Sequence, residues 1–165
     1  MCKEEDLHKL KTLGVKDSKL LIHKKRCLLY DELKKISNKY KIIKIEPKEI
    51  DDAVESDVMN LNWLEAHKTA EIINSLKPDK AYIDCPSPNI NKYKGYLLKL
   101  LDNKDIELFV EHKADFKYVV VGAASIIAKC VREEEVKKIE KITGQSIGTG
   151  YMSNPICQKF LKENF

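Results

Sequence analysis

The chain has 165 residues, of which 43% are apolar and 34% charged, with six Gly and five Pro; this is the size and composition of one globular domain, and it excludes a long disordered segment. The five cysteines form no CxxC pair, which argues against a disulfide framework and a zinc site, and no apolar run approaches the roughly 20 residues that cross a membrane. We therefore expect residues 1–165 to form a single domain in a reducing cytoplasm, with no membrane contact.

The formal net charge of +4 is unevenly distributed along the chain. Between Lys16 and Lys48 there are 11 Lys and Arg residues against four acidic residues, whereas residues 49–76 hold seven acids and one base, Lys68. The basic stretch either faces the phosphates of a nucleic acid or forms the solvated face of a helix, and the count alone does not separate these interpretations.

Apolar spacing and turn residues predict alternating helices and strands. In chain order these are a helix over residues 18–35, a strand over 40–46 that Pro47 ends, a helix over 61–76, a strand over 81–84, a helix over 93–101, a strand over 106–110, a helix over 120–142 that Gly144 stops, and the start of a helix over 155–165. Strands that alternate with helices indicate an α/β sheet.

Two acidic residues follow successive predicted strands. Asp84 comes directly after Ala81, Tyr82 and Ile83, and Asp115 lies a few residues beyond Val110. A single acid in such a position is often a helix cap, but two carboxylates at one end of a sheet repel each other unless a cation lies between them. Without a cysteine cluster or an HxxxH spacing, Mg²⁺ or Mn²⁺ is the expected ion.

Five motifs then point to a family. They are GVKDSK (14–19), MNLNWLEAHKTAEII (59–73), YIDCPS (82–87), EHKADFKYVVVGAASIIAK (111–129) and GTGYMSNP (148–155). In this order, and covering nearly the whole chain, they closely resemble archaeal ribonuclease HII. EHKAD followed by AASIIAK is the most specific of them, whereas GTG or KDSK alone would be weak.

The resemblance implies an RNase H-like fold, a mixed sheet flanked by helices. It implies a monomeric endonuclease that cleaves the RNA strand of RNA/DNA hybrids and the 5′ side of single ribonucleotides embedded in duplex DNA. Such an enzyme would use two divalent metal ions and would serve ribonucleotide excision repair and DNA replication. Asp84 and Asp115 match two of the family's four metal-binding acids, and Tyr151 matches the tyrosine that packs on a deoxyribose beside the ribonucleotide.

Other positions carry weaker expectations. Ser18 and Lys19 match the KDSK loop, whose hydroxyl and ammonium groups suit phosphate contacts, and Lys113 lies where it would touch the scissile phosphate. His112 is either a metal ligand or a hydrogen-bond partner of the backbone. Trp63 is predicted to lie in the core rather than to stack on a base.

The chain departs from the family pattern at both ends. It contains no DEAGRG string, the motif that supplies the other two acids and the turn that grips the 2′-OH, and it ends at KENF, before the family's closing helices. We therefore expect a partial domain without the first two strands, in which residues 40–46 lack a neighbour and residues 81–84 have one open edge. Two-metal chemistry should then fail in the chain alone, because each ion needs about six oxygen ligands.

The absence of these acids has three possible explanations. They lie upstream in the same protein, they belong to a second polypeptide of a split enzyme, or the chain is a decayed remnant that has lost them. The alternative function is accordingly a non-catalytic module or subunit that binds nucleic acid.

Overall fold

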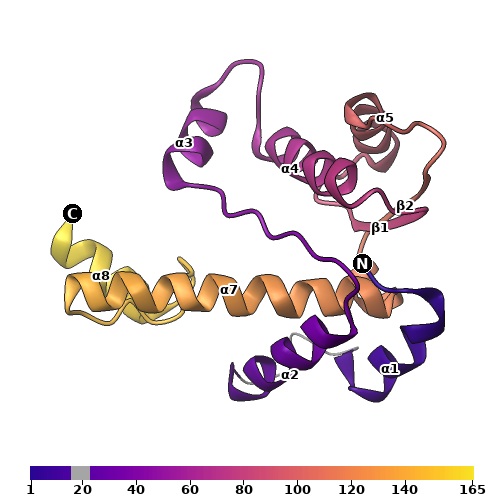
Figure 1. The fold of residues 1–165 in the computed structure, drawn as a ribbon. Helices are drawn as coiled ribbons and strands as arrows, with labels where there is room; N and C mark the ends of the chain where they lie inside the picture. Colours follow the sequence, from indigo (N-terminus) through magenta and orange to yellow (C-terminus); the bar gives the residue numbers. More distant parts are fainter. Residues whose placement is uncertain (16–22) are drawn as a thin grey trace.

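The computed structural model describes residues 1–15 and 23–165, so the expected start of a helix at residue 18 lies outside the described residues (Figure 1). Within that part of the chain, most of the structure is helical. In chain order the elements are η1 (Glu4–Asp6), α1 (Leu7–Thr12), α2 (His23–Ile36), α3 (Pro47–Glu55), α4 (Leu61–Leu76), β1 (Lys80–Asp84), α5 (Ile90–Leu100), β2 (Glu107–Glu111), α6 (Ala114–Lys117), α7 (Val119–Thr143) and α8 (Pro155–Asn164).

The start of α4 and the ends of α4 and α7 have recognisable caps. At the start of α4 the Asn60 side chain accepts a hydrogen bond from the Trp63 N–H at 3.1 Å, and the helix ends at Lys77 in a left-handed conformation. At the end of α7, Gly144 has a φ of 67°, which glycine adopts without steric cost. The helices predicted over 61–76 and 120–142 are confirmed.

The stretch from residue 40 to Pro47 differs from the prediction. Residues 40–46 have no regular secondary structure, and Pro47 is the first residue of α3 instead of the end of a strand. Proline suits the first turn of a helix, where its missing N–H would have no intrahelical partner. An extended segment becomes a strand only with a ladder partner, and β1 pairs with β2 alone in the described chain. The predicted strand over 40–46 is therefore wrong.

The sheet consists of two parallel strands in direct register. Its pairing runs from Lys80 opposite Glu107 to Asp84 opposite Glu111, and the Cys85 N–H extends it by donating to the Glu111 carbonyl at 2.9 Å. Helix α5 connects the two strands, and because the strands are parallel they end at the same edge of the sheet. The mixed α/β class is thus confirmed, with a sheet of two strands.

Two clusters of buried side chains hold these elements together. The first packs α4 and α5 on the sheet and contains Ala66, Ala70, Ile73, Tyr93, Leu97, Leu108 and Val110; Trp63 packs against it, as predicted. The second joins α1 and α2 to the amino-terminal half of α7 and contains Leu10, Val15, Leu29, Leu33, Ala123, Ile126 and Cys130. An ion pair between Arg26 and Glu133 also connects α2 to α7.

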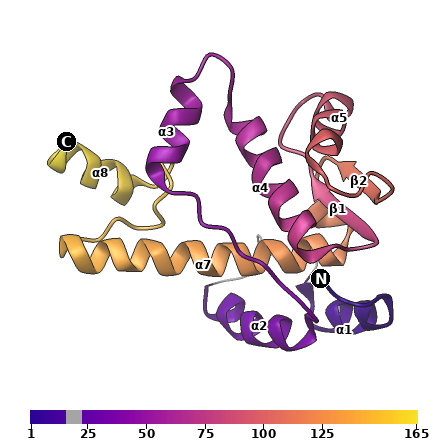
Figure 2. The same ribbon diagram turned by 45° about the horizontal axis from the view of Figure 1, so that its top comes forward.

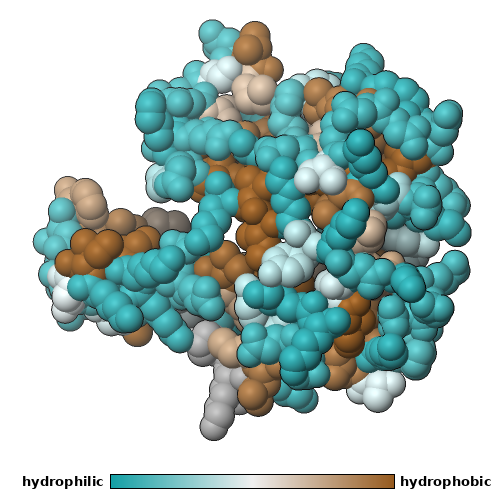
Figure 3. All heavy atoms as spheres, in the orientation of Figure 1, coloured by the Kyte–Doolittle hydropathy of each residue, from teal (hydrophilic) through white to brown (hydrophobic). Residues whose placement is uncertain are grey.

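The long helix α7 is the common support of the molecule. Figures 1 and 2 show it crossing the whole structure, with the sheet at its amino-terminal end and α8 near its carboxyl-terminal end. Figure 3 shows hydrophobic surface along the space between α7 and the part of the molecule that carries α3 to α5. Within the described residues, no helix is both long and apolar enough to span a membrane.

Candidate active site

The carboxyl-terminal edge of the sheet brings the two predicted acids together. Asp84 is the last residue of β1, and its Oδ1 accepts a hydrogen bond from the Ala114 N–H at 3.1 Å. Asp115 follows Ala114 directly, lies in the first turn of α6 and is only 8% exposed. The carboxylate of Asp84 therefore touches the turn that carries Asp115.

A tight turn between β2 and α6 makes this arrangement possible. Lys113 has a φ of 56°, a left-handed conformation that costs energy in a residue with a side chain. It reverses the chain after β2, so that the Ala114 N–H points back to Asp84. The His112 ring contacts the same region, with Nδ1 lying 3.3 Å from the Cys85 carbonyl oxygen. Of the two interpretations of His112, the structure supports the hydrogen bond to the backbone.

The amino-terminal turn of α7 packs closely against the turn that carries Asp115. A Cβ atom at Gly122 would lie 3.1 Å from the Val15 carbonyl oxygen and 3.3 Å from the Asp115 carbonyl oxygen. Both contacts involve backbone atoms, which cannot rotate away as the end of a flexible side chain can. Glycine at position 122 thus lets α7 approach and fix the backbone of Asp115.

Two further carboxylates lie near this edge, and their environments differ. Lys117 and the Tyr118 hydroxyl, which donates to Glu111 Oε1 at 2.6 Å, lower the pKa of Glu111 and engage its side chain outside the Asp84–Asp115 pair. For Glu65 of α4, burial and then the negative charge of Asp84 raise the pKa. Glu65 therefore lies within electrostatic reach of Asp84, which the sequence pattern does not reveal.

The donor chemistry of this edge suits a hard divalent cation. Asp84 and Asp115 offer carboxylate oxygens, the ligands that Mg²⁺ and Mn²⁺ prefer. Among residues 1–15 and 23–165, however, no three His, Cys, Asp or Glu side chains are grouped closely enough to hold an ion. The type of ligand fits a metal ion, whereas the number of ligands within the described residues falls short of the about six that such an ion needs.

The predicted substrate-contacting tyrosine lies on a separate loop. Tyr151 follows Gly148 and Gly150, which have φ values of 61° and 67°, and the residue is 50% exposed. Arg132 of α7 donates from Nη1 to the Thr149 carbonyl at 3.0 Å and stacks on the Tyr151 ring. Arg132 lies ten residues beyond Gly122, about 15 Å further along the helix, so the tyrosine does not touch the two acids directly.

The remaining predicted contacts are placed only in part. Lys113 is exposed and lies two residues before Asp115, as expected of a group that meets a phosphate. Ser18 and Lys19 lie outside the described residues. The roles assigned to Lys113, Ser18, Lys19 and Tyr151 remain predictions.

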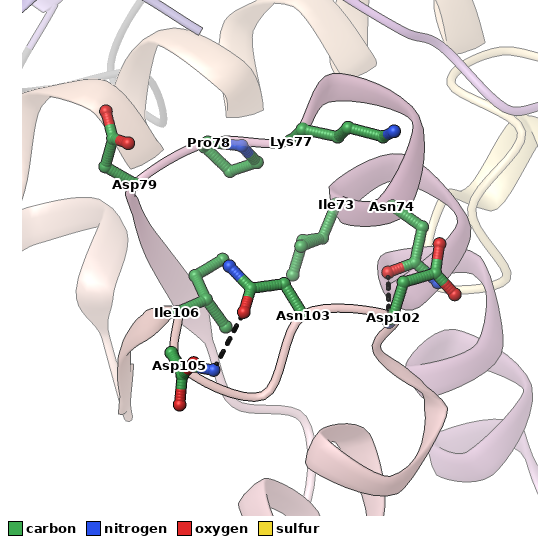
Figure 4. Close-up of a pocket in the computed structure, with 9 residues that line it drawn as sticks. All are labelled: Ile73, Asn74, Lys77, Pro78, Asp79, Asp102, Asn103, Asp105 and Ile106. Carbon is green, nitrogen blue, oxygen red and sulfur yellow. Dashed lines mark hydrogen bonds between the residues drawn. The ribbon is translucent and has the colours of Figure 1, made fainter.

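A hollow elsewhere on the molecule does not coincide with these groups. It measures about 650 Å³ and opens at the other end of the sheet, where Asp79 precedes β1 and Ile106 precedes β2 (Figure 4). Its lining is Ile73, Asn74, Lys77, Pro78, Asp79, Asp102, Asn103, Asp105 and Ile106. Hydrogen bonds from the Asp102 N–H to Asn74 and from the Asp105 N–H to Asn103 fix this loop, which gives the hollow a structural explanation.

Comparison with known proteins agrees with this architecture. The family model described as Ribonuclease HII matches residues 1–165. The ribonuclease HII of Pyrococcus furiosus is 40% identical over 164 residues, which cover 98% of this chain and 70% of that protein. The ribonuclease HII of Methanococcus maripaludis strain C6 is 41% identical over 164 residues, covering 97% of this chain and 67% of its own length.

Solved structures show the same fold. The structure of a PCNA:RNase HII complex from Archaeoglobus fulgidus matches with a TM-score of 0.87 and 37% identity, over 99% of this chain and 75% of that one. The ribonuclease H2 of Pyrococcus horikoshii matches with a TM-score of 0.87 and 36% identity, over 98% of this chain and 75% of that one.

Proposed function

Because the chain belongs to the ribonuclease HII family of metal-dependent, ribonuclease H-type endonucleases, we propose that it serves to cleave the RNA strand of RNA/DNA hybrids and the 5′ side of single ribonucleotides in duplex DNA. One observation carries the proposal. Asp84 ends β1, and Asp115 lies in the first turn of α6, just after the neighbouring parallel strand β2; the hydrogen bond from the Ala114 N–H to Asp84 joins the two segments. Such an edge is where α/β sheets place their functional groups.

In this proposal five residues of the chain have definite roles. Asp84 and Asp115 would hold Mg²⁺ or Mn²⁺, and bound ions of this kind supply an activated water and stabilise charge on the leaving oxygen. Lys113 would meet the phosphate at the cleavage point, and Ser18 and Lys19 would contact phosphates further along the duplex.

Asp84 and Asp115 do not complete a two-ion site. We propose that further carboxylates on a DEAGRG segment, in the same protein or in a second chain, complete the ligand set of a single domain that includes residues 1–165. Glu65 of α4 is near enough to Asp84 to feel its charge, but we assign it no role in holding the ions.

The test is cleavage of a labelled DNA duplex that contains one ribonucleotide, in Mg²⁺ or Mn²⁺. The chain is assayed alone and with a DEAGRG segment joined to its amino terminus. In the extended protein, Asp84→Asn and Asp115→Asn should each lower the rate by roughly 100-fold or more, since removing even a group that only supports a metal ligand costs about 10–100-fold. Calorimetric titration with Mn²⁺ should show the same loss without relying on activity.

Asp105→Asn is the matched control, because Asp105 lines the hollow at the opposite end of the sheet. It makes the same change of charge and should leave the rate unchanged. If Asp115→Asn keeps the rate within a few fold of the parent, the metal role of Asp115 is wrong.

The second candidate is a non-catalytic subunit that binds nucleic acid, which is motivated by the lack of a DEAGRG string in residues 1–165 and by the excess of basic residues between Lys16 and Lys48. It predicts binding to duplexes that weakens steeply with salt and no cleavage by the chain in either form. Cleavage by the purified chain without any added segment would contradict it.

A further inference from the structure

The side chain of Tyr151 has one covered face. The Arg132 guanidinium carbon lies 3.6 Å from the centroid of the tyrosine ring, which is the separation of two groups in direct van der Waals contact. The residue as a whole nevertheless keeps half of its surface exposed. The guanidinium covers one face of the flat ring, and the exposure of the residue leaves room for a contact on the other face.

The same arginine also fixes the loop that carries the tyrosine. Its Nη1 donates to the Thr149 carbonyl at 3.0 Å, and a Cβ atom at Gly150 would lie 2.9 Å from Val136 Cγ2 and 3.4 Å from Arg132 Nη2. The loop therefore rests directly on one turn of α7. The Asn154 N–H donates to the Tyr151 carbonyl at 2.8 Å and holds the other side of the loop.

The geometry of the guanidinium suits this double task. It is planar, so one set of atoms can stack on a ring while its in-plane N–H groups bond to a carbonyl. A lysine ammonium is a compact charge that cannot do both in a fixed orientation. The position of Arg132 on α7, a helix of 25 residues, gives it a rigid base.

We propose that Arg132 is a positioning residue for substrate recognition, which holds the Tyr151 ring so that its open face meets a deoxyribose of the bound duplex. The proposal rests on the proposed function of this chain and adds a specificity residue to it. A 2′-hydroxyl at that sugar would place a polar group against the apolar ring face, so the stacked tyrosine favours DNA at that position.

The experiment measures the affinity of the full chain for two labelled duplexes by fluorescence anisotropy at one salt concentration. One is a DNA duplex with a single ribonucleotide, and the other is an RNA/DNA hybrid of the same sequence. The quantity compared is the affinity for the DNA duplex with a single ribonucleotide divided by the affinity for the RNA/DNA hybrid. Arg132→Lys keeps the charge and Arg132→Gln removes it; both should lower the ratio about 3- to 10-fold, and Tyr151→Ala should lower it similarly.

Two variants serve as controls. Tyr151→Phe keeps the ring and should keep the ratio. Lys141→Gln removes a positive charge from the last turn of α7, and it should change the two affinities equally or not at all.

A spectroscopic signal tests the stack without any substrate. The proton on Nε of Arg132 should show a ring-current shift in the NMR spectrum that Tyr151→Leu abolishes and Tyr151→Phe retains. An Arg132 signal that is indifferent to Tyr151→Leu would overturn the proposal.

The outcomes distinguish a failure of the role of Arg132 from a failure of the role of Tyr151. If Tyr151→Ala lowers the ratio but neither Arg132 variant does, Arg132 has no positioning role while the role of Tyr151 stands. If Tyr151→Ala leaves the ratio unchanged, or the chain binds neither duplex, the tyrosine's role in substrate recognition fails and the inference about Arg132 fails with it.

Discussion

At the level of single residues, Asp84 has a structural task that the hydrogen bond shows and an electrostatic task that we propose. Its Oδ1 accepts the Ala114 N–H and so holds the turn that carries Asp115, while its negative charge is what a metal ion requires. The hydrogen bond needs an acceptor oxygen but not a charge. The structural task and the electrostatic task can therefore be separated by substitution.

Asp84→Asn and Asp84→Ala make this separation. Asparagine keeps an acceptor oxygen, so the variant should unfold in urea close to the parent, yet in the protein extended by the DEAGRG segment it should lose Mn²⁺ binding in calorimetry. Alanine leaves the Ala114 N–H without its acceptor and should lower the free energy of unfolding by about 1–3 kcal/mol. Equal destabilisation by the two substitutions would show that the charge of Asp84, and not its hydrogen bond, holds the turn.

At the level of elements, the sequence predicts those whose ends are marked by their own residues. Helix α4 has its cap at Asn60, and α7 ends at Gly144, so both could be located from spacing and caps alone. Helix α3 could not, because Pro47 suits both the end of a strand and the first turn of a helix. Residues 40–46 have the composition of a strand, but a strand also depends on a partner that local sequence does not supply.

The candidate site also combines features that local sequence predicts with features that depend on tertiary packing. The meeting of Asp84 with the turn of Asp115 follows from two strands that end at one edge, which the alternation of elements predicts. The approach of Glu65 to Asp84 depends on how α4 packs on the sheet, and the stack of Arg132 on Tyr151 joins residues on a helix and a loop. Contacts of this kind have no signature in local spacing, so only the folded structure shows them.

The end of α7 and the loop that follows it are coupled through Glu140. Its Oε1 accepts hydrogen bonds from the Ser146 hydroxyl at 2.8 Å and the Ile147 N–H at 2.9 Å, and these bonds lower the pKa of Glu140. Because its pKa in the folded state lies below the usual 4.5, the ionised carboxylate stabilises the folded state above that pH. The stabilisation is lost as the pH falls through the pKa in the folded state.

We expect Glu140→Gln to melt below the parent at pH 7, and the difference to close as the pH falls below 4.5 through the pKa of Glu140 in the folded state. Thermal unfolding followed by circular dichroism over this range measures it. Glu134→Gln makes the same charge change on the same helix without removing the Glu140 carboxylate, so it serves as the control. A difference that stays constant, or grows at low pH, would contradict the role given to the Glu140 carboxylate.

At the level of the whole molecule, the distribution of charge bears on how a duplex would bind. Much of the basic stretch is already engaged within the protein, through the ion pairs Arg26–Glu133, Lys35–Glu32, Lys41–Glu71, Lys44–Glu135 and Lys48–Asp52. A lysine that keeps its acidic partner neutralises a phosphate less fully, so fewer of the cations condensed on the nucleic acid are released. The interpretation of this stretch as a solvated, internally paired surface is therefore favoured over a phosphate-binding surface for these residues.

The salt dependence of duplex binding distinguishes the two surfaces. Lys113 is exposed beside Asp115, whereas Lys44 is paired with Glu135, so Lys113→Gln and Lys44→Gln make the same chemical change in different surroundings. On a plot of the logarithm of affinity against the logarithm of salt concentration, Lys113→Gln should reduce the slope by about 1, and Lys44→Gln should leave it nearly unchanged. Fluorescence anisotropy at several salt concentrations gives both slopes. The opposite result would move the phosphate contacts from the edge of the sheet to the basic stretch, and with them the path of the duplex across the molecule.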